Sequence, residues 1–204
     1  MRVLVAGATG VIGSRLVPQL TAAGHEVFAT SRSARKAGEL ARLGAEPVVM
    51  DGLDAVAVGE AVGRAEPEVV IHQMSALTNA SDVRHFDRAF ATTNKLRTAG
   101  TDHLLTAARA AGTRLFIAQS YTGWPNTRTG GPVKTEEDPL DSDPPAGQRE
   151  TLAGIRYLEQ AVTSAPLTGI VLRYGGLYGP GASDMIAEPV RKRRLPVVGG
   201  GAGI

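Results

Sequence analysis

Short apolar runs alternate with amphipathic segments along the chain, and this alternation predicts the fold. The apolar runs predict six strands, at residues 2–6, 26–30, 47–50, 69–71, 115–118 and 168–172. The segments between them predict helices near residues 14–20, 33–43, 54–64, 92–111 and 149–164. The continuous β-branched run at 69–71 is typical of a central strand buried on both faces. Strands that alternate with helices at this spacing indicate an α/β protein with a doubly wound parallel sheet.

A glycine-rich turn joins the first strand to the first helix. One glycine permits the tight turn, one lets the backbone approach a pyrophosphate, and one lets helix and strand pack closely. The N–H groups and the dipole at the helix start then favour an anion. A plain tight turn is the alternative, but the position between strand and helix favours a dinucleotide site on a Rossmann-type fold. The residues predicted to hold the pyrophosphate of NAD or NADP are Gly7, Thr9, Gly10, Val11, Ile12 and Gly13.

The end of the second strand bears on the choice between NAD and NADP. An acid there binds the ribose 2′-hydroxyl of NAD, whereas an arginine accommodates the 2′-phosphate of NADP. This chain has Ser31, Arg32 and Ser33 at that place, Arg35 just beyond, and no acid nearby. A guanidinium can hold a phosphate through two hydrogen bonds. The sequence therefore predicts NADP in preference to NAD; the alternative is that Arg32 is a solvated residue starting the next helix.

Composition narrows the class of protein. The 22 basic and 20 acidic residues give a net charge of +2, which is too balanced to indicate a nucleic-acid-binding protein. No cysteine is present, and the four histidines lack metal-ligand spacing, so we expect no metal site. No segment approaches the roughly 18 apolar residues of a membrane helix. We expect a cytoplasmic protein with a small-molecule substrate.

Four segments together resemble one known family. The turn has Gly-x-x-Gly-x-x-Gly spacing, and residues 69–72, 100–108 and 172–181 are similar to the fourth strand, a central helix and the sequence after strand six of that family. On these motifs the chain resembles the extended branch of the short-chain dehydrogenase/reductase superfamily, which contains epimerases and dehydratases. The resemblance covers essentially the whole chain.

The resemblance implies further cofactor contacts. Asn94 lies one helical turn before Arg97, where the family pattern expects an asparagine, so Asn94 is a candidate as well. The residues that the resemblance places along the cofactor are Asp51, Gly52, Gln73, Met74, Ser75, Asn94, Tyr174, Gly175 and Leu177.

The catalytic pattern of that branch is only partly present. The family uses a Ser or Thr after strand five, matched by Ser120, and then a Tyr and a Lys four residues apart on the following helix. No Tyr-x-x-x-Lys occurs in the sequence, and alignment of that helix puts Thr151 and Ile155 at the two positions. Neither replaces its counterpart, because an alcohol is too weak an acid and Ile carries no proton. Tyr121 and Tyr157 are candidates for a recruited acid, with packing as the alternative.

Two functions follow from this pattern. One is an NAD(P)-dependent oxidoreductase of the epimerase/dehydratase type, acting at a carbinol or carbonyl carbon, with Ser120 orienting the substrate oxygen. The other is a non-catalytic NADP-binding or redox-sensing protein.

The expected domain organisation also rests on the resemblance. We expect residues 1–180 to form the NAD(P)-binding domain and residues 181–204 to begin an incomplete substrate-binding region; a naturally short binding protein is the alternative. The family also implies a homodimer, for which Leu152, Ile155, Leu158 and Val162 offer an apolar stripe at helical spacing. The alternative is that this stripe only packs on the sheet.

Overall fold

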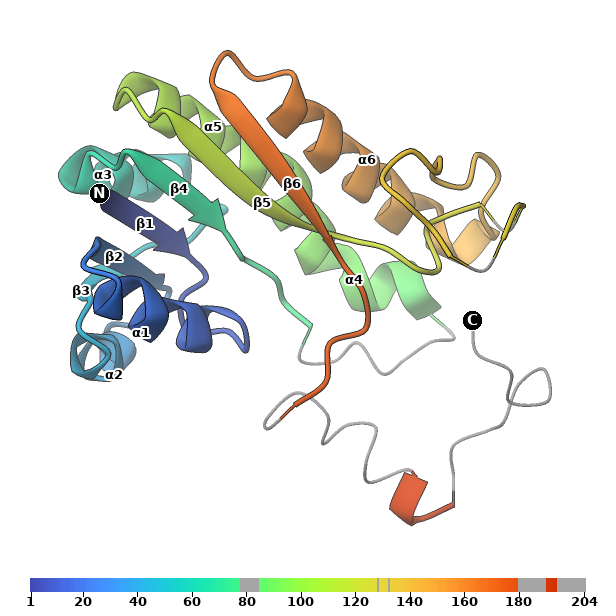
Figure 1. The fold of residues 1–204 in the computed structure, drawn as a ribbon, viewed down its shortest axis with the longest axis horizontal. Helices are drawn as coiled ribbons and strands as arrows, with labels where there is room; N and C mark the ends of the chain where they lie inside the picture. Colours follow the sequence, from blue (N-terminus) through green and yellow to red (C-terminus); the bar gives the residue numbers. More distant parts are fainter. Residues whose placement is uncertain (78–84, 128, 132, 180–189, 194–204) are drawn as a thin grey trace.

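One parallel sheet organises the chain in a computed structural model, which describes residues 1–77, 85–127, 129–131, 133–179 and 190–193. Its six strands are β1 (Arg2–Ala6), β2 (Glu26–Ser31), β3 (Glu46–Val49), β4 (Val69–His72), β5 (Leu115–Tyr121) and β6 (Thr168–Tyr174). They lie in the order β3-β2-β1-β4-β5-β6, and every pair is parallel (Figure 1). The order reverses between β1 and β4, and ligands of such sheets bind beyond the carboxyl ends of the strands at this reversal.

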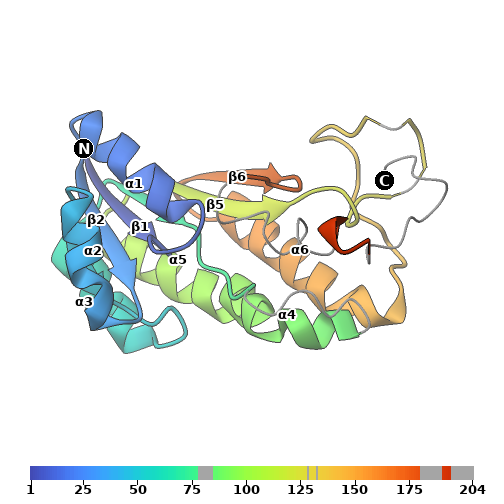
Figure 2. The ribbon, with the colours of Figure 1, turned by 90° about the horizontal axis from the view of Figure 1, so that it is seen from below.

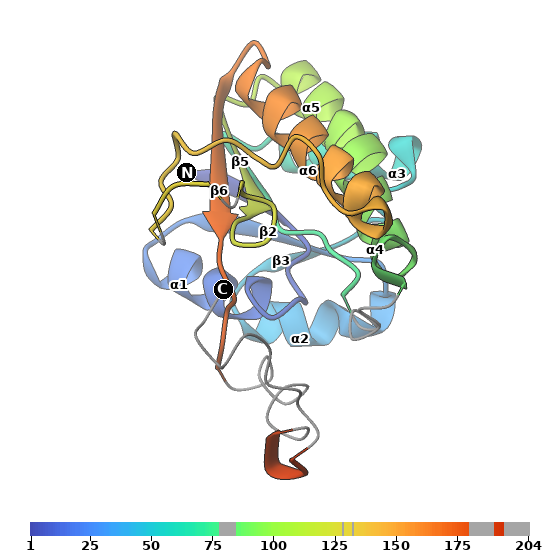
Figure 3. The same cartoon turned by 90° about the vertical axis from the view of Figure 1, so that its right-hand side faces the viewer.

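Helices cover both faces of the sheet. On one face lie α1 (Gly13–Ala22) and α2 (Ala37–Arg42); on the other lie α3 (Ala55–Ala65), α4 (Phe86–Lys95), α5 (Thr101–Ala110) and α6 (Arg149–Thr163), as Figure 2 shows. In Figure 3, β6 forms the edge of the sheet, with α5 and α6 to one side and α1 to the other. This is the expected doubly wound, Rossmann-type architecture.

Two apolar cores explain why these segments adopt this arrangement. Alternate residues of a strand point to opposite faces, so Leu4 joins the core under α3, α5 and α6, whereas Val3 and Val5 join the core under α1 and α2. In the apolar stripe of α6, Leu158 and Val162 belong to the core that contains Leu4, and all four stripe residues are at most 1% exposed within the chain itself. These side chains are therefore buried inside the chain, and a homodimer would need other residues.

The helix expected at residues 92–111 differs from the prediction in two ways. It begins earlier, at Phe86, and it is interrupted by a π-helical turn, η3 (Leu96–Gly100), between α4 and α5. Isolated π-helical turns inside α-helices occur often at functional sites. The interruption begins two residues after Asn94 and contains Arg97, the residue at the family's asparagine position.

Smaller differences concern other element boundaries. The helix expected at 33–43 is divided into a short 3-10 turn, η1 (Ala34–Lys36), and α2, and β5 extends through Ser120 rather than ending before it. The long loop after β5 carries one bridge between Asn126 and Leu140 and a 3-10 turn, η4 (Ala146–Gln148). The region expected after residue 180 lies outside the described residues except for 190–193. None of the described helices combines the length and apolar character required to cross a bilayer.

Candidate active site

The turn between β1 and α1 is packed too closely for a side chain at two of its three glycines. Gly7 has φ +90°, and a Cβ there would lie 2.7 Å from the carbonyl carbon of Gln73. A Cβ on Gly13 would lie 2.5 Å from the Gly7 oxygen. At Gly10 the requirement differs, because a Cβ would meet only the Gly7 oxygen, at 3.3 Å. Gly7 and Gly13 are therefore required by the fold, whereas Gly10 leaves an open approach above the turn.

The start of α1 offers unused hydrogen-bond donors. Among the described residues, the N–H groups of Val11, Ile12 and Gly13 have no backbone or side-chain acceptor, whereas the Ala8 N–H donates to the Thr30 carbonyl at 3.2 Å. An open groove of about 340 Å³ runs beside them. Its lining includes Val11, Ile12, Arg15, Tyr174, Leu177 and Tyr178. Free N–H groups at a helix N-terminus fit a phosphate, so the turn formed by Gly7, Thr9, Gly10, Val11, Ile12 and Gly13 fits the pyrophosphate.

The end of β2 presents two cationic side chains to solvent. Ser31 is buried and its Oγ accepts a hydrogen bond from the Ser33 N–H at 3.2 Å, which fixes the turn. Arg32 and Arg35 are exposed and have no hydrogen-bond or ion-pair partner among the described residues. Asp51, after the neighbouring β3, accepts a hydrogen bond from the Leu53 N–H at 3.0 Å. Arg32 and Arg35, which are predicted to contact the 2′-phosphate, are therefore accessible to a ligand at one edge of the site.

The residues after β4 and β6 meet at the reversal of the sheet. Gln73 is buried, and its Nε2 donates to the Tyr174 hydroxyl at 3.3 Å, while its Oε1 is buried without a partner in the described chain. A buried oxygen without a donor is costly, so a bound group with an N–H or O–H fits here. Met74 is buried, and a Cβ on Gly52 would collide with its sulfur. The remaining predicted residues of this edge, Ser75, Gly175 and Leu177, are exposed.

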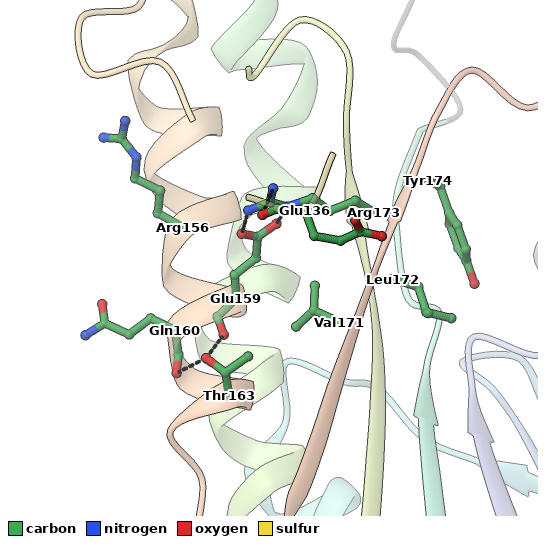
Figure 4. A pocket seen from close by; sticks show the side chains of 9 residues that line it. All are labelled: Glu136, Arg156, Glu159, Gln160, Thr163, Val171, Leu172, Arg173 and Tyr174. Atoms are coloured by element: carbon green, nitrogen blue, oxygen red, sulfur yellow. Dashed lines mark hydrogen bonds and ion pairs between the residues drawn. The ribbon is translucent and has the colours of Figure 1, made fainter. Parts of the chain in front are cut away.

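Ser120 lies in an ion-paired network on the α6 side of β5. Its hydroxyl donates to Glu159 Oε1 at 2.6 Å. Arg173 binds both oxygens of Glu159, at 2.9 and 2.8 Å (Figure 4). These bonds to Glu159 raise the pKa of the Arg173 guanidinium. The pair borders a groove of about 710 Å³ between α6 and β6. Because a hydroxyl has one proton, Ser120 in this arrangement can accept a hydrogen bond from a substrate but has no proton left to donate. Sequence spacing gave no signal for this pair.

The two positions that should carry Tyr and Lys are buried on α6. Thr151 donates through Oγ1 to Asp87 Oδ1 at 2.6 Å and accepts from Asn94 Nδ2 at 3.1 Å. Asp87 also accepts from the N–H groups of Glu150 and Thr151, so it caps the start of α6 from α4. Ile155 is 1% exposed and is therefore buried within the chain. The structure thus brings Asn94 to Thr151, where the family pattern would have the tyrosine.

Near Asn94 lie two basic side chains, Arg97, which is half-buried, and His72, which is fully buried. The Arg97 guanidinium donates to Asn94 Oδ1 at 3.3 Å, and burial lowers its pKa to about 10. Burial also lowers the pKa of His72 to about 4, helped by the nearby charge of Arg97. His72 Nδ1 accepts from the Met74 N–H at 3.2 Å, so its other nitrogen carries the proton toward the Leu96 carbonyl. His72 is therefore a neutral core histidine at neutral pH.

Of the tyrosines considered as recruited acids, one lies away from the site. Tyr157 is 42% exposed on the outer side of α6, and its hydroxyl donates to Asp102 at 2.7 Å, which raises its pKa. Tyr121 is partly buried, with its ring 6.3 Å from that of Trp124. No group of three or more His, Asp or Glu side chains suited to a metal occurs among the described residues.

Comparisons with known proteins assign the chain to a family. Residues 3–199 match the NAD dependent epimerase/dehydratase family. The chain is 48% identical over its whole length to the 3-diazoavenalumate denitrifying reductase of a Streptomyces species and 30% identical over 99% of its length to the 2-alkyl-3-oxoalkanoate reductase of Stenotrophomonas maltophilia. It spans 66% and 59% of the lengths of these relatives.

Solved structures agree with the sequence comparison. UDP-glucose 4-epimerase of Thermus thermophilus, solved in complex with NAD, superposes with a TM-score of 0.66 at 28% identity, over 89% of this chain and 57% of that one. The chain belongs to the NAD-dependent epimerase/dehydratase family.

Proposed function

We propose that the protein is an NADPH-dependent reductase that transfers hydride to an acceptor whose reduction needs no tyrosine acid. The proposal rests on one observation: the cofactor-binding turn is intact, whereas the catalytic positions on α6 lack Tyr and Lys. The cofactor cradle around Gly7 and Gly13 admits only backbone, with free N–H groups beside it. The catalytic positions on α6, by contrast, hold Thr151 and Ile155, which the fold uses for packing.

The choice of NADPH rests on the end of β2. Arg32 and Arg35 are exposed, unpaired among the described residues and close in sequence to the buried Ser31. No acid occupies the place where a carboxylate would bind the ribose 2′-hydroxyl and repel a 2′-phosphate. Two guanidinium groups at this edge favour the phosphate of NADP, and NAD is the less favoured cofactor.

The nature of the acceptor follows from the two hydroxyl groups at the family's catalytic positions, those of Ser120 and Thr151. Reduction of a ketone leaves an alkoxide, which must receive a proton from the site. Ser120 already donates its proton to Glu159, and Thr151 donates its own to Asp87. An arenediazonium has no such requirement, because hydride forms the new C–H bond while the electron pair of the C–N bond leaves with N2. When bound, NADPH supplies that hydride and becomes NADP⁺, so atoms and charges balance. The relative at 48% identity is named as a denitrifying reductase of a diazo compound, which agrees with this chemistry.

The test compares two acceptors on the purified protein. A stabilised hydroxyarenediazonium salt and an aryl ketone of similar size are each incubated with NADPH, and loss of the reduced-nicotinamide absorbance is followed against enzyme-free reactions. General acid catalysis contributes about 10²–10⁴-fold, so we expect the ketone to react at least about a hundredfold more slowly. Equal rates for the two acceptors would contradict the proposal.

The second candidate function is a non-catalytic NADP-binding protein that senses the redox state of the cofactor. The observation that favours it is the same commitment of the Ser120 and Thr151 protons to carboxylates of the chain. NADPH binding without turnover of the diazonium salt or the ketone would favour this candidate over the reductase.

A further inference from the structure

Arg97 is a half-buried cation with no anionic partner among the described residues. It stands in the π-helical turn η3 and donates a single hydrogen bond, to the neutral Asn94 side chain at 3.3 Å. It forms no ion pair with any carboxylate of the described residues. Taking a guanidinium out of water costs free energy that an anionic partner normally offsets. The burial is incomplete, so a ligand can reach the group.

The groups around Arg97 cannot supply that anion. His72 is neutral, since burial holds its pKa at about 4. The carboxylate on α4, that of Asp87, already accepts hydrogen bonds from the Thr151 hydroxyl and from the N–H groups at the start of α6. Asn94 is held between Thr151 and Arg97. A negative charge for Arg97 must therefore come from outside the described chain.

Aromatic rings collect toward the other end of α4. Phe86 and Phe90 stack at 4.4 Å, Phe86 meets Trp124 edge-on at 5.0 Å, and Trp124 lies 6.3 Å from Tyr121. The sequence has nine aromatic side chains (four Phe, four Tyr and one Trp), and these four are in neither apolar core of the sheet. All four are partly exposed, at the carboxyl end of β5 where the hydride acceptor would bind.

The two features lie near each other along α4. Phe86, Phe90 and Asn94 are four residues apart, so they follow one stripe of the helix. The hydrogen bond from Arg97 to Asn94 places the guanidinium at the end of that stripe. Phe90 and Arg97 are seven residues apart, or about 10 Å along the axis. This separation fits an aromatic ring joined to an anion by a short spacer.

We propose that α4 and the loop after β5 bind an aromatic carboxylate, with the ring on Phe86, Phe90 and Trp124 and the carboxylate on Arg97. This proposal rests on the proposed function in so far as it identifies the aromatic carboxylate as the substrate that is reduced. Binding itself needs neither NADPH nor turnover, so the two proposals can fail separately. A guanidinium binds a carboxylate through two parallel hydrogen bonds, and ring stacking adds selectivity for a planar group.

Three small probes separate charge from aromaticity. They are 3-phenylpropanoate, its neutral amide 3-phenylpropanamide, and the non-aromatic acid 3-cyclohexylpropanoate. Trp124 is the sole tryptophan of the sequence, so the change of its emission reports binding at the cluster directly. We expect 3-phenylpropanoate to bind at least about tenfold more tightly than the amide and more tightly than the cyclohexyl acid. Equal binding of acid and amide, or no saturable change with any probe, would overturn the proposal.

Variants on α4 and in the adjoining turn η3 assign the charge to one residue. Arg97→Met should abolish the preference for acid over amide, and Arg97→Lys should keep part of it, because an ammonium is charged but lacks the planar fork. Arg88→Met is the matched control, since Arg88 is exposed on α4 and should leave the preference unchanged. Loss of an unpaired buried charge should not lower the melting temperature, which checks that Arg97→Met is folded. An acid preference that survives in folded Arg97→Met would refute the assignment, whatever the NADPH oxidation assay shows.

Discussion

Replacement of Gly10 by alanine separates cofactor binding from folding. Gly10 is exposed, its φ lies outside the left-handed region, and a Cβ there would meet only the Gly7 oxygen at 3.3 Å. The methyl group makes one tight contact, so it should lower the free energy of unfolding by about 1 kcal/mol, less than the loss at Gly7. It would, however, stand where the pyrophosphate approaches the turn. Loss of one or two charge-assisted hydrogen bonds, at about 1.5–3 kcal/mol each, corresponds to at least about tenfold weaker NADPH binding.

Gly7→Ala should behave in the opposite way. At φ +90° an alanine is strained by about 1–3 kcal/mol, and its Cβ would collide with Gln73 at 2.7 Å, which adds about 1–3 kcal/mol. The sum of about 2–6 kcal/mol is a large share of the roughly 5–15 kcal/mol that stabilises a typical domain. We therefore expect Gly7→Ala to lower the melting temperature strongly, with loss of binding as a consequence of unfolding.

Calorimetric titration with NADPH and thermal melting of both variants check this contrast. Gly38→Ala on α2 is the control, because a Cβ there meets no atom within 4 Å and should leave binding unchanged. The reasoning is refuted if Gly10→Ala binds NADPH as the wild type does, or if Gly7→Ala melts as the wild type does.

Three further predictions concern specificity and stability. Arg32→Asp should reverse the preference from NADP to NAD, measured by calorimetry with both cofactors; an unchanged preference would show that Arg32 does not contact the phosphate. His72 has a folded pKa of about 4 against an ordinary 6.5, so below pH 6.5 the unfolded chain takes up a proton that the folded chain does not. Urea titrations should therefore show about 2 kcal/mol less stability at about pH 5 than at neutral pH. His72→Gln should remove this pH dependence. A loss of the same size in the variant would count against a buried neutral His72. Asp87→Ala should cost about 1–3 kcal/mol, because α6 loses its cap, whereas Asp87→Asn, which keeps an acceptor oxygen, should cost less; equal losses would contradict the capping role.

Sequence patterns were sufficient for the sheet because its determinants are local. The apolar runs of β1 and β4, the glycine spacing after β1 and the periodicity of α6 each lie within a few residues, and the structure has all of them where expected. The start of α4 was missed because Phe86 and Phe90 are set in a predominantly polar stretch, where their helical spacing is a weak signal. The π-helical turn was missed because one extra residue in a helical turn leaves no mark in composition.

The chemistry of the site was less predictable for a different reason. The partner of Ser120, Glu159, lies 39 residues away on α6, and Arg173, which binds Glu159, lies on β6, so no local pattern links these residues. The unpaired state of Arg97 likewise depends on which carboxylates the fold directs elsewhere, above all Asp87. Sequence spacing was therefore enough to identify candidate site residues. The hydrogen-bond partner of Ser120 and the lack of an ion-pair partner for Arg97 could be read only from the folded structure.

The central claim, hydride transfer without a tyrosine acid, is tested most directly by the fate of the nicotinamide hydrogen. NADPH carrying deuterium on the transferred position of C4 is incubated with the protein and a hydroxyarenediazonium salt in ordinary water, and the arene product and N2 are measured. The account predicts one deuterium at the carbon that carried the diazo group and one N2 for each NADPH oxidised, with no solvent isotope effect on the rate, because no proton moves. An arene whose new hydrogen comes from water, or a rate that falls several-fold in deuterated solvent, would contradict it.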